Sequence, residues 1–464
     1  MDSYVVKSSW GGVSDFDNKG IAGSFKFGTN LDIRKKTDSI ACGQALTDDD
    51  GGVVTDLVLF TVPASDGNTY MFGDTGKIYK RTSLGVTTLV YTDSGGKIRG
   101  AAEFGLSTAT AYLYWATATA LHRKLIGNGS AWSNVDTDTA GWPKALTSAT
   151  WHTMRNINGL LVICNENVMA SVGSDSSYNA SALQLIPGDT AKCLLERNLY
   201  AVIGTVRTDG LSQTGLYLWD QIADNFNLRK TVPANNINAI LDAEMPLMQI
   251  GDDGHVYYSD LVEQLPMFRL PGGGEVNPDG IENDAGLTLF GVFGAETGKD
   301  GVYGYGRRFK NHPRGVLNLE YALTCDEIGS VKKAGDDILI SFKNGSDYGV
   351  KRVDTTTKAV ATYEGLELAA PDKFSDHQPN WAHVRIITKA MPASTSIECY
   401  YKVDKAASWT QAKLQGNITA FNTTGATEAV FLCGAKGFTF EYKFVLTPSA
   451  NTTPEIYRTY IGLE

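Results

Sequence analysis

The sequence has few cysteines and no long apolar run, and both shortages narrow the class of protein. None of its six cysteines belongs to a CxxC pair, and most have apolar neighbours. We therefore expect free, buried thiols in a protein made in a reducing compartment. No run approaches a membrane span, and the opening Met-Asp-Ser-Tyr lacks the basic and apolar regions of a signal peptide. We expect a soluble chain that is not exported through the general secretory pathway.

The short motifs of catalysis and metal binding are also missing. The six histidines never stand at HxH or HxxxH spacing, and there is no GxSxG, no P-loop and no GxGxxG after a strand. We interpret the glycines 272–274 as a flexible loop. The sequence therefore predicts no catalytic, cofactor-binding or metal-binding residue and no cofactor, and it disfavours an enzyme.

The chain has fewer positively charged residues than negatively charged ones. The chain has 41 Lys and Arg against 51 Asp and Glu, a formal net charge of −10. A negative surface repels phosphate, which argues against a nucleic-acid reader or an anionic-membrane binder. The basic run 307–314 is the exception, and we interpret it as a solvated loop or a salt-bridge surface for a partner.

What the sequence does contain favours an all-β fold. Glycine outnumbers proline by 49 to 14, and aromatic residues make up 10% of the chain. Residues 247–258 show the local pattern: an apolar strand, the turn Gly-Asp-Asp-Gly, and a second strand, His-Val-Tyr-Tyr. Glycine and aspartate suit such turns, and β-branched and aromatic residues suit a half-buried sheet. This stretch predicts a β-hairpin.

Approximate copies of the hairpin recur along the chain. Their turns centre near residues 75, 119, 166, 210, 253, 298 and 345, so the steps are 44, 47, 44, 43, 45 and 47 residues. A period of about 45 residues without helical periodicity is typical of β-propeller blades. We predict about seven blades, with six or eight as alternatives. The Pro- and Gly-rich stretch 265–274 is interpreted as a long loop between blades.

The pattern changes after Pro371–Pro379, where the strands become longer and alternate more regularly. Five strands are expected, at 383–388, 396–403, 428–433, 438–446 and 456–461, which predicts a C-terminal β-sandwich. The predicted domains are residues 1–50, strands that close or decorate the propeller; 51–375, the propeller; and 376–464, the sandwich.

Several acidic residues are candidates for chemistry. Residues 48–52, Asp-Asp-Asp-Gly-Gly, are compatible with a weak calcium site, although an acidic turn is the better interpretation. Propeller glycosidases place carboxylates at the mouth of the central channel. Asp56, Asp220, Asp260 and Asp336 are available for such a role, but no spacing selects among them. We interpret these residues, like Asp252 and Asp253, as turn and surface residues.

Several stretches together resemble the β-propeller tail proteins of tailed bacteriophages. The opening segment Gly-Ser-Phe-Lys-Phe-Gly-Thr-Asn-Leu-Asp-Ile-Arg (23–34) is similar to the segment before the first blade of such chains. Val-Tyr-Tyr-Ser-Asp (256–260) followed by Leu-Pro-Met-Phe (265–268) resembles their recurring blade end. Cys-Asp-Glu-Ile-Gly-Ser-Val (325–331), Thr-Pro-Glu-Ile (453–456) and the final Ile-Gly-Leu-Glu also resemble phrases of this family.

The resemblance implies a non-enzymatic structural protein of the virion, a tail nozzle, hub or tail-tip component. Such proteins form a ring of identical copies, often six, around the DNA ejection channel. The expected partners are further copies in a homohexamer, other tail or adaptor proteins, and fibres. Double-stranded DNA would be met only in transit, and no membrane insertion is expected. The expected location is the virion tail, after assembly in the host cytoplasm.

Two other functions remain open from the sequence. The first is a receptor-binding or carbohydrate-binding propeller module. The second is a propeller glycoside hydrolase, which requires two carboxylates about 5–10 Å apart at the channel mouth.

Overall fold

The structure is a computed structural model, and it describes residues 2–6, 13–14, 24–35, 38–105, 110–126, 132, 135, 141–242, 246–259, 263–307, 315–371 and 377–464. These residues form an all-β fold of 39 strands without an α-helix. Consequently, no helix in the described ranges has the length and apolarity to cross a membrane. Seven sheets have four strands each, and an eighth is larger and mixed.

The chain divides into two compact units, which are described separately. The first, called here the ring unit, comprises Asp48–Gly301 and Thr324–Arg352. The second, called the terminal unit, comprises Met1–Thr47, Val302–Leu323 and Val353–Glu464.

Five four-stranded antiparallel sheets follow one another along the ring unit, each with its strands in chain order. Their strands are β4 (Val58–Pro63), β5 (Thr69–Gly73), β6 (Lys77–Arg81) and β7 (Thr87–Thr92); β8 (Gly100–Phe104), β9 (Tyr112–Ala116), β10 (Ala120–Leu125) and β11 (Lys144–Ala145); β12 (Met154–Ile157), β13 (Leu160–Asn165), β14 (Val168–Val172) and β15 (Tyr178–Gln184); β16 (Asp189–Arg197), β17 (Tyr200–Arg207), β18 (Thr214–Trp219) and β19 (Leu228–Val232); and β20 (Ile237–Asp242), β21 (Pro246–Ile250), β22 (His255–Ser259) and β23 (Gln264–Arg269).

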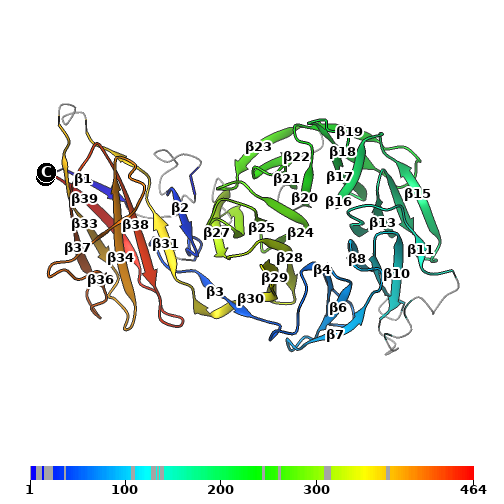
Figure 1. Cartoon of the computed structure of the whole chain (residues 1–464), viewed down its shortest axis with the longest axis horizontal. Coiled ribbons are helices and arrows are strands. Elements are labelled where there is room, and N and C mark those ends of the chain that lie inside the picture. Colours follow the sequence, from blue (N-terminus) through cyan, green and yellow to red (C-terminus); the bar gives the residue numbers. More distant parts are fainter. Residues whose placement is uncertain are drawn as a thin grey trace. The chain divides into compact units, whose positions relative to one another are not determined.

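The series of sheets then closes on itself. The antiparallel pair β24 (Glu275–Asp284) and β25 (Leu287–Phe293) follows β23. A last four-stranded sheet has the order β28 (Glu327–Ala334), β29 (Asp337–Asn344), β30 (Asp347–Lys358) and β3 (Gln44–Asp48). The first strands touch in succession, β4 with β8, then β12, β16, β20, β24 and β28, and β28 touches β4 again (Figure 1).

Apolar side chains hold neighbouring sheets together. One cluster joins the sheet of β4 to that of β8 and includes the fully buried Phe72 and Trp115, whose ring centres lie 6.4 Å apart. Another joins the last sheet to the first and includes Val58, Tyr79 and Leu339. Because each sheet buries both faces against neighbours, the core of the ring unit is a series of apolar layers and not one central core.

The predicted hairpins are confirmed by the strand pairings. The turns near 75, 119, 166, 210, 253 and 345 each join two paired antiparallel strands. Gly76 shows why glycine is needed in one of them: its φ is +93°, and a Cβ there would lie 2.5 Å from the Asp93 carbonyl oxygen. The turn near 298 connects β25 to β26 (Gly301–Arg307).

The interpretation of residues 265–274 as one long loop is wrong. Gln264–Arg269 forms β23, the outermost strand of its sheet, and only residues 270–274 connect it to the next strand, with a turn closed by a hydrogen bond from Gly273 N–H to the Leu270 carbonyl. Pro266 is tolerated because β23 is an edge strand, where one backbone N–H is not needed by a further neighbour.

The terminal unit contains two sheets. One has the order β1 (Asp2–Val6), β39 (Ile456–Leu463), β33 (Asn380–Thr388) and β37 (Glu428–Lys436). The strands of the larger mixed sheet in this unit run in the order β26, β27 (Gly315–Ala322), β2 (Phe27–Thr29), β31 (Ala361–Glu364), β38 (Thr439–Thr447), β34 (Ser396–Val403) and β35 (Thr410–Ala412), with β32 (Leu368–Ala369) beside β38 and β36 (Ala420–Phe421) beside β34.

One apolar cluster lies between these two sheets. Trp381 of β33 is fully buried and stacks on Phe440 of β38, with ring centres 4.8 Å apart. The five C-terminal strands predicted from the sequence all exist with bounds within a few residues of those expected.

The compact units differ from the predicted domains 1–50, 51–375 and 376–464. Residues 302–323 belong with 353–464 and with the N-terminal strands. The reason is that β2 pairs in parallel with β27 and antiparallel with β31, so that three distant stretches of chain share one sheet.

Candidate binding site

The structure does not gather the acidic residues that the sequence offered for catalysis. Asp56 is buried before β4 and accepts hydrogen bonds from the backbone and hydroxyl of Thr75. Asp220 lies between β18 and β19 and accepts hydrogen bonds from Ile222, Ala223 and Asn227, as a turn residue does. Asp336 is exposed in the turn between β28 and β29. In the described part of the chain, no hydrogen bond or ion pair joins any two of these three carboxylates. Asp260 lies outside the described residues.

The acidic turn 48–52 is occupied by structural contacts. Arg81 binds Asp49 through two hydrogen bonds of 2.6 and 2.9 Å and also binds Asp337 at 2.7 Å. Arg352 adds a 3.1 Å contact to Asp49. Asp50 accepts a hydrogen bond from the backbone of Val54. Among the described residues no three acidic, His or Cys side chains are placed to hold a metal ion.

Two further predictions concern turn and loop residues. Asp252 and Asp253 lie in the β21–β22 turn as predicted, and Asp253 accepts a hydrogen bond from the exposed His255 ring. Of the basic run 307–314, only Arg307, the last residue of β26, is described, so the interpretation of the run stays a prediction. All six cysteines are free, and five of them are buried, which confirms the expectation of free thiols.

A charged cluster missed by the sequence analysis lies on the first strands of the ring unit. Lys332 of β28 is 3.1 Å from a Glu282 oxygen and 3.6 Å from an Asp279 oxygen, both on β24. Asp279 also accepts hydrogen bonds from the Ser330 hydroxyl and from the backbone of Thr61 on β4. Burial raises the pKa of Asp279, an effect that Lys332 opposes. Because Lys332 contacts both carboxylates and Asp279 also binds Thr61, the cluster links β24, β28 and β4, each of which is the first strand of its sheet.

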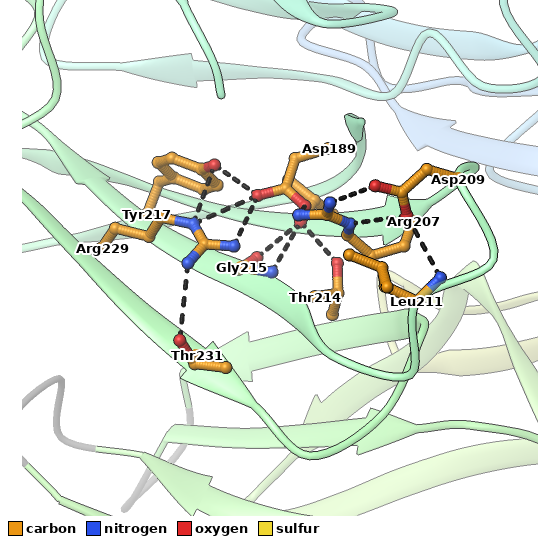
Figure 2. Close-up of polar contacts among 10 residues, drawn as sticks. Asp189, Arg207, Asp209, Leu211, Thr214, Gly215, Tyr217, Arg229 and Thr231 are labelled. Atoms are coloured by element: carbon orange, nitrogen blue, oxygen red, sulfur yellow. Dashed lines mark hydrogen bonds and ion pairs between the residues drawn. The ribbon is translucent and has the colours of Figure 1, made fainter. Parts of the chain in front are cut away.

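The most developed polar site in the ring unit is built around Asp189, the first residue of β16, which is fully buried. Arg229 of β19 donates to Asp189 Oδ2 from Nη2 at 2.9 Å and from Nε at 3.2 Å. Arg207, the last residue of β17, donates to Asp189 Oδ1 at 3.2 Å. The Tyr217 hydroxyl of β18 also donates to Oδ2. One buried carboxylate thus orients two guanidinium groups (Figure 2).

The surrounding contacts fix the orientation of both arginines. Asp209 accepts two hydrogen bonds from Arg207, through Nε at 3.0 Å and through Nη2. Arg229 Nε donates to the Tyr217 hydroxyl at 3.0 Å, and its Nη1 lies 3.4 Å from the Thr231 hydroxyl. The Arg207 contact lowers the pKa of Asp209 to about 2. Burial and then the Asp189 hydrogen bond raise the pKa of Tyr217 to about 12. The Asp209 carboxylate and the Tyr217 phenol therefore keep fixed protonation states near neutral pH.

A pocket of about 260 Å³ opens above these side chains. Its lining residues are Arg207, Leu211, Ser212, Gln213, Arg229 and Thr231. Ser212 and Gln213 come from the exposed β17–β18 turn, and the structure shows no hydrogen bond from either side chain to the described residues. The pocket therefore combines a rigid floor with free polar groups on one wall.

Sequence reasoning could not have found this site. Asp189, Arg207 and Arg229 come from three different strands, and they meet only because β16, β17, β18 and β19 pair in a particular register. The local signal at this site is the Asp-Gly pair at 209–210, which predicts a hairpin turn and no binding site.

Comparisons with known proteins give no family for the chain. No family model matches it, and no curated protein matches its sequence. Among solved structures, U3-55K has 14% identity and a TM-score of 0.49, and the match covers 67% of this chain and 99% of that one. A chain in the mitotic checkpoint complex has 10% identity and a TM-score of 0.47, covering 73% and 96%. The extracellular domain of BT4673 from B. thetaiotaomicron has 12% identity and a TM-score of 0.45, covering 82% and 46%. At these values we base no argument on the three likenesses.

Proposed function

We propose that the chain is a structural subunit of a bacteriophage tail, with the ring unit as a seven-bladed β-propeller and the terminal unit built around a β-sandwich. Seven first strands in a closed series support the propeller. Its last blade takes its fourth strand, β3, from the N-terminal part of the chain. Propellers commonly bury every sheet face between neighbouring blades in this way.

The observation that carries the proposal is the structural role of the opening segment 23–34, the first of the stretches that resemble bacteriophage tail proteins. Phe25, Leu31 and Ile33 are buried in the core of the terminal unit. The Arg34 guanidinium donates to Glu320 at 2.9 Å and to the carbonyl oxygens of three residues, Gly304, Gly306 and Val316, at 3.1, 3.3 and 3.4 Å. The segment therefore has a structural role, as expected for a motif of a structural subunit.

Asn30 connects the same segment to two distant parts of the chain. Its φ is +54°, and its side chain accepts a hydrogen bond from the backbone of Ala322 and donates one to the carbonyl of Val360. Residues from three parts of the chain are thereby locked to one position. Such a rigid joint suits a subunit that must keep its shape under load.

The proposal includes the assembly. The subunits would form a ring, most simply a homohexamer, within the virion tail, with double-stranded DNA passing along the axis of the assembly. Other tail or adaptor proteins and fibres would bind its outer surfaces, and the ring would assemble in the host cytoplasm without entering a membrane. The net charge of −10 supports a passage role, because an acidic wall neutralises few phosphates and does not retain DNA.

The proposal is tested by light scattering and negative-stain imaging of the purified chain, together with mass spectrometry of purified phage particles. We expect closed rings of uniform diameter and the chain among the particle proteins. A protein that remains a monomer at all concentrations and is absent from particles would overturn the proposal.

A further inference from the structure

We propose that the pocket above Asp189 is a binding site for a single neutral sugar residue. The site lies wholly within the ring unit, and the inference does not depend on whether the chain assembles into a ring. It rests on four observations: the fixed arginines, the balance of charge, the free polar side chains and the size of the pocket.

The first observation is that donors and acceptors are both present in fixed positions. Asp189 and Asp209 take up three of the five N–H groups of Arg207, which leaves two N–H groups on this guanidinium. Arg229 likewise retains donors on Nη1 and Nη2 beyond those bound to Asp189 and Thr231. Thr231, which also lines the pocket, offers the remaining acceptor lone pair of its hydroxyl. Adjacent sugar hydroxyls need this combination, because each hydroxyl both donates and accepts.

The second observation is that the site carries no net charge. Two arginines are balanced by two aspartates, Asp189 and Asp209, both ion-paired to them. An anion in the pocket would be attracted by the two guanidinium groups and repelled by the two carboxylates paired behind them, so its electrostatic gain would be small. A neutral polyol has no such conflict. The charge balance therefore favours a neutral ligand over a phosphate or a carboxylate.

The third observation concerns the wall. Ser212 and Gln213 are exposed and have no intramolecular hydrogen bond in the described structure, so both are free to bind ligand hydroxyls. Leu211, which is 57% exposed, supplies an apolar surface for the C–H face of a ring. These three residues lie on one turn and face a floor that cannot rearrange.

The fourth observation is size. The cavity of about 260 Å³ lies below the roughly 300–1,000 Å³ of pockets for drug-sized ligands. Room for one sugar residue predicts weak affinity, roughly millimolar for a ligand of about a dozen heavy atoms. Several such sites on an assembly would strengthen binding to a polysaccharide by avidity.

The test uses the full chain and ligand-observed saturation-transfer NMR with the methyl glycosides of glucose, galactose and mannose. We expect at least one glycoside to show a clearly stronger saturation-transfer signal than the others. Gln213→Ala and Ser212→Ala should each reduce the signal several-fold, because they remove hydrogen bonds to the ligand and none within the protein. Ser346→Ala, in the corresponding exposed turn between β29 and β30, is the matched control and should leave the signal unchanged.

Acetate and inorganic phosphate form the second arm of the experiment. If either anion perturbs the amide signals of residues 211–213 while no glycoside does, the assignment to a neutral sugar is wrong. Binding of a glycoside that survives Gln213→Ala and Ser212→Ala unchanged would also overturn the proposal, because the sugar would then lie elsewhere. Neither result bears on ring assembly, which is measured separately by light scattering.

Discussion

Asp56 is a buried carboxyl group with an unusual protonation equilibrium. Its side chain lies beside Asp74 and accepts two hydrogen bonds from Thr75 through one oxygen. Burial, followed by the interaction with Asp74, raises its pKa to about 7. Asp56 therefore keeps its proton over much of the acidic range and has a structural role beside the first sheet of the ring unit.

This shift predicts how the free energy of unfolding depends on pH. The folded state keeps the Asp56 proton up to about pH 7, whereas the unfolded chain loses it near pH 3.9. Between these values the folded state binds more protons, so the free energy of unfolding falls as the pH rises, by about 1.4 kcal/mol for each unit of pKa difference. Asp56→Asn should flatten this dependence. Urea unfolding at pH 5 and pH 8 measures it.

Asp336→Asn is the matched control, because Asp336 is exposed in a turn. It should leave the difference between the two pH values unchanged. Equal changes in the free energy of unfolding between pH 5 and pH 8 for the wild-type protein and for Asp56→Asn would contradict the raised pKa of Asp56.

The polar site around Asp189 shows what the sequence could not reveal at the level of single residues. Arg207 and Arg229 look like ordinary surface cations in the sequence. Their role depends on the buried Asp189 carboxylate, 18 and 40 residues away, which they reach only when β16, β17, β18 and β19 pair. The candidate acids that sequence reasoning did name are dispersed, because turn aspartates occur wherever a hairpin needs one.

At the level of elements, the closure of the ring unit depends on the close approach of β28 to β4. Gly329 of β28 lies so near β4 that an added Cβ would overlap with the carbonyl oxygen of Val58. The Ser341 hydroxyl, from the neighbouring β29, accepts a hydrogen bond from the backbone of Val58 at 3.0 Å. Backbone atoms cannot move aside as a flexible side chain can.

Gly329→Ala should therefore destabilise the ring unit by about 1–3 kcal/mol, the usual cost of overpacking. Gly349→Ala in β30 is the control, since a Cβ there would be 3.1 Å from the ring of Phe342, which can shift slightly. Urea unfolding of the two variants gives the comparison. Equal stability would show that β28 and β4 do not pack as closely as described.

Arg34 supports a second junction, inside the terminal unit. Its partner Glu320 is largely buried, and burial raises the pKa of this carboxyl group while Arg34 opposes the effect. Arg34→Ala would leave Glu320 without its partner and should cost about 3–5 kcal/mol of unfolding free energy.

The exposed pair Arg385–Glu428 provides the comparison for Arg34. Both side chains of this pair are more than 40% exposed, so Arg385→Ala should cost less than about 1 kcal/mol. Thermal unfolding of the two variants, followed by tryptophan fluorescence, measures both effects. Similar costs would contradict the structural role of Arg34.

The strands divide clearly into those that were predictable and those that were not. The two strands of each predicted hairpin are joined by a turn, which contains Gly or Asp in five of the seven, and their residues alternate in a readable way, so all seven hairpins were found. The outer strand β23 was missed because it contains Pro266, and the first strand β24 because it contains a bulge between Val276 and Ile281 and carries Asn, Pro and Asp. Such strands form because of neighbours that are distant in the sequence, so the local sequence pattern does not predict them.

At the level of the whole molecule, charge gives a further prediction. A chain with a net charge of −10 should not shift linear double-stranded DNA in an electrophoretic mobility assay at 150 mM salt, because it offers few cations to displace counterions from the phosphates. DNA binding that weakens steeply with added salt would contradict the passage role. A basic protein that binds double-stranded DNA without sequence specificity is the positive control for the assay.

Strand β3 has a consequence for how the protein is made. It leaves the ribosome among the first 50 residues, but its partner β30 follows some 300 residues later, and the contact of Arg352 with Asp49 spans 303 positions. At about 5–20 residues per second, the early strand waits on the order of 15–60 s for its place. During that time its edge is open to pairing with another nascent chain. When several ribosomes translate one mRNA close together, two nascent copies are therefore expected to exchange β3. The yield of chains in which β3 pairs with its own β30 should fall as translation initiation becomes more frequent.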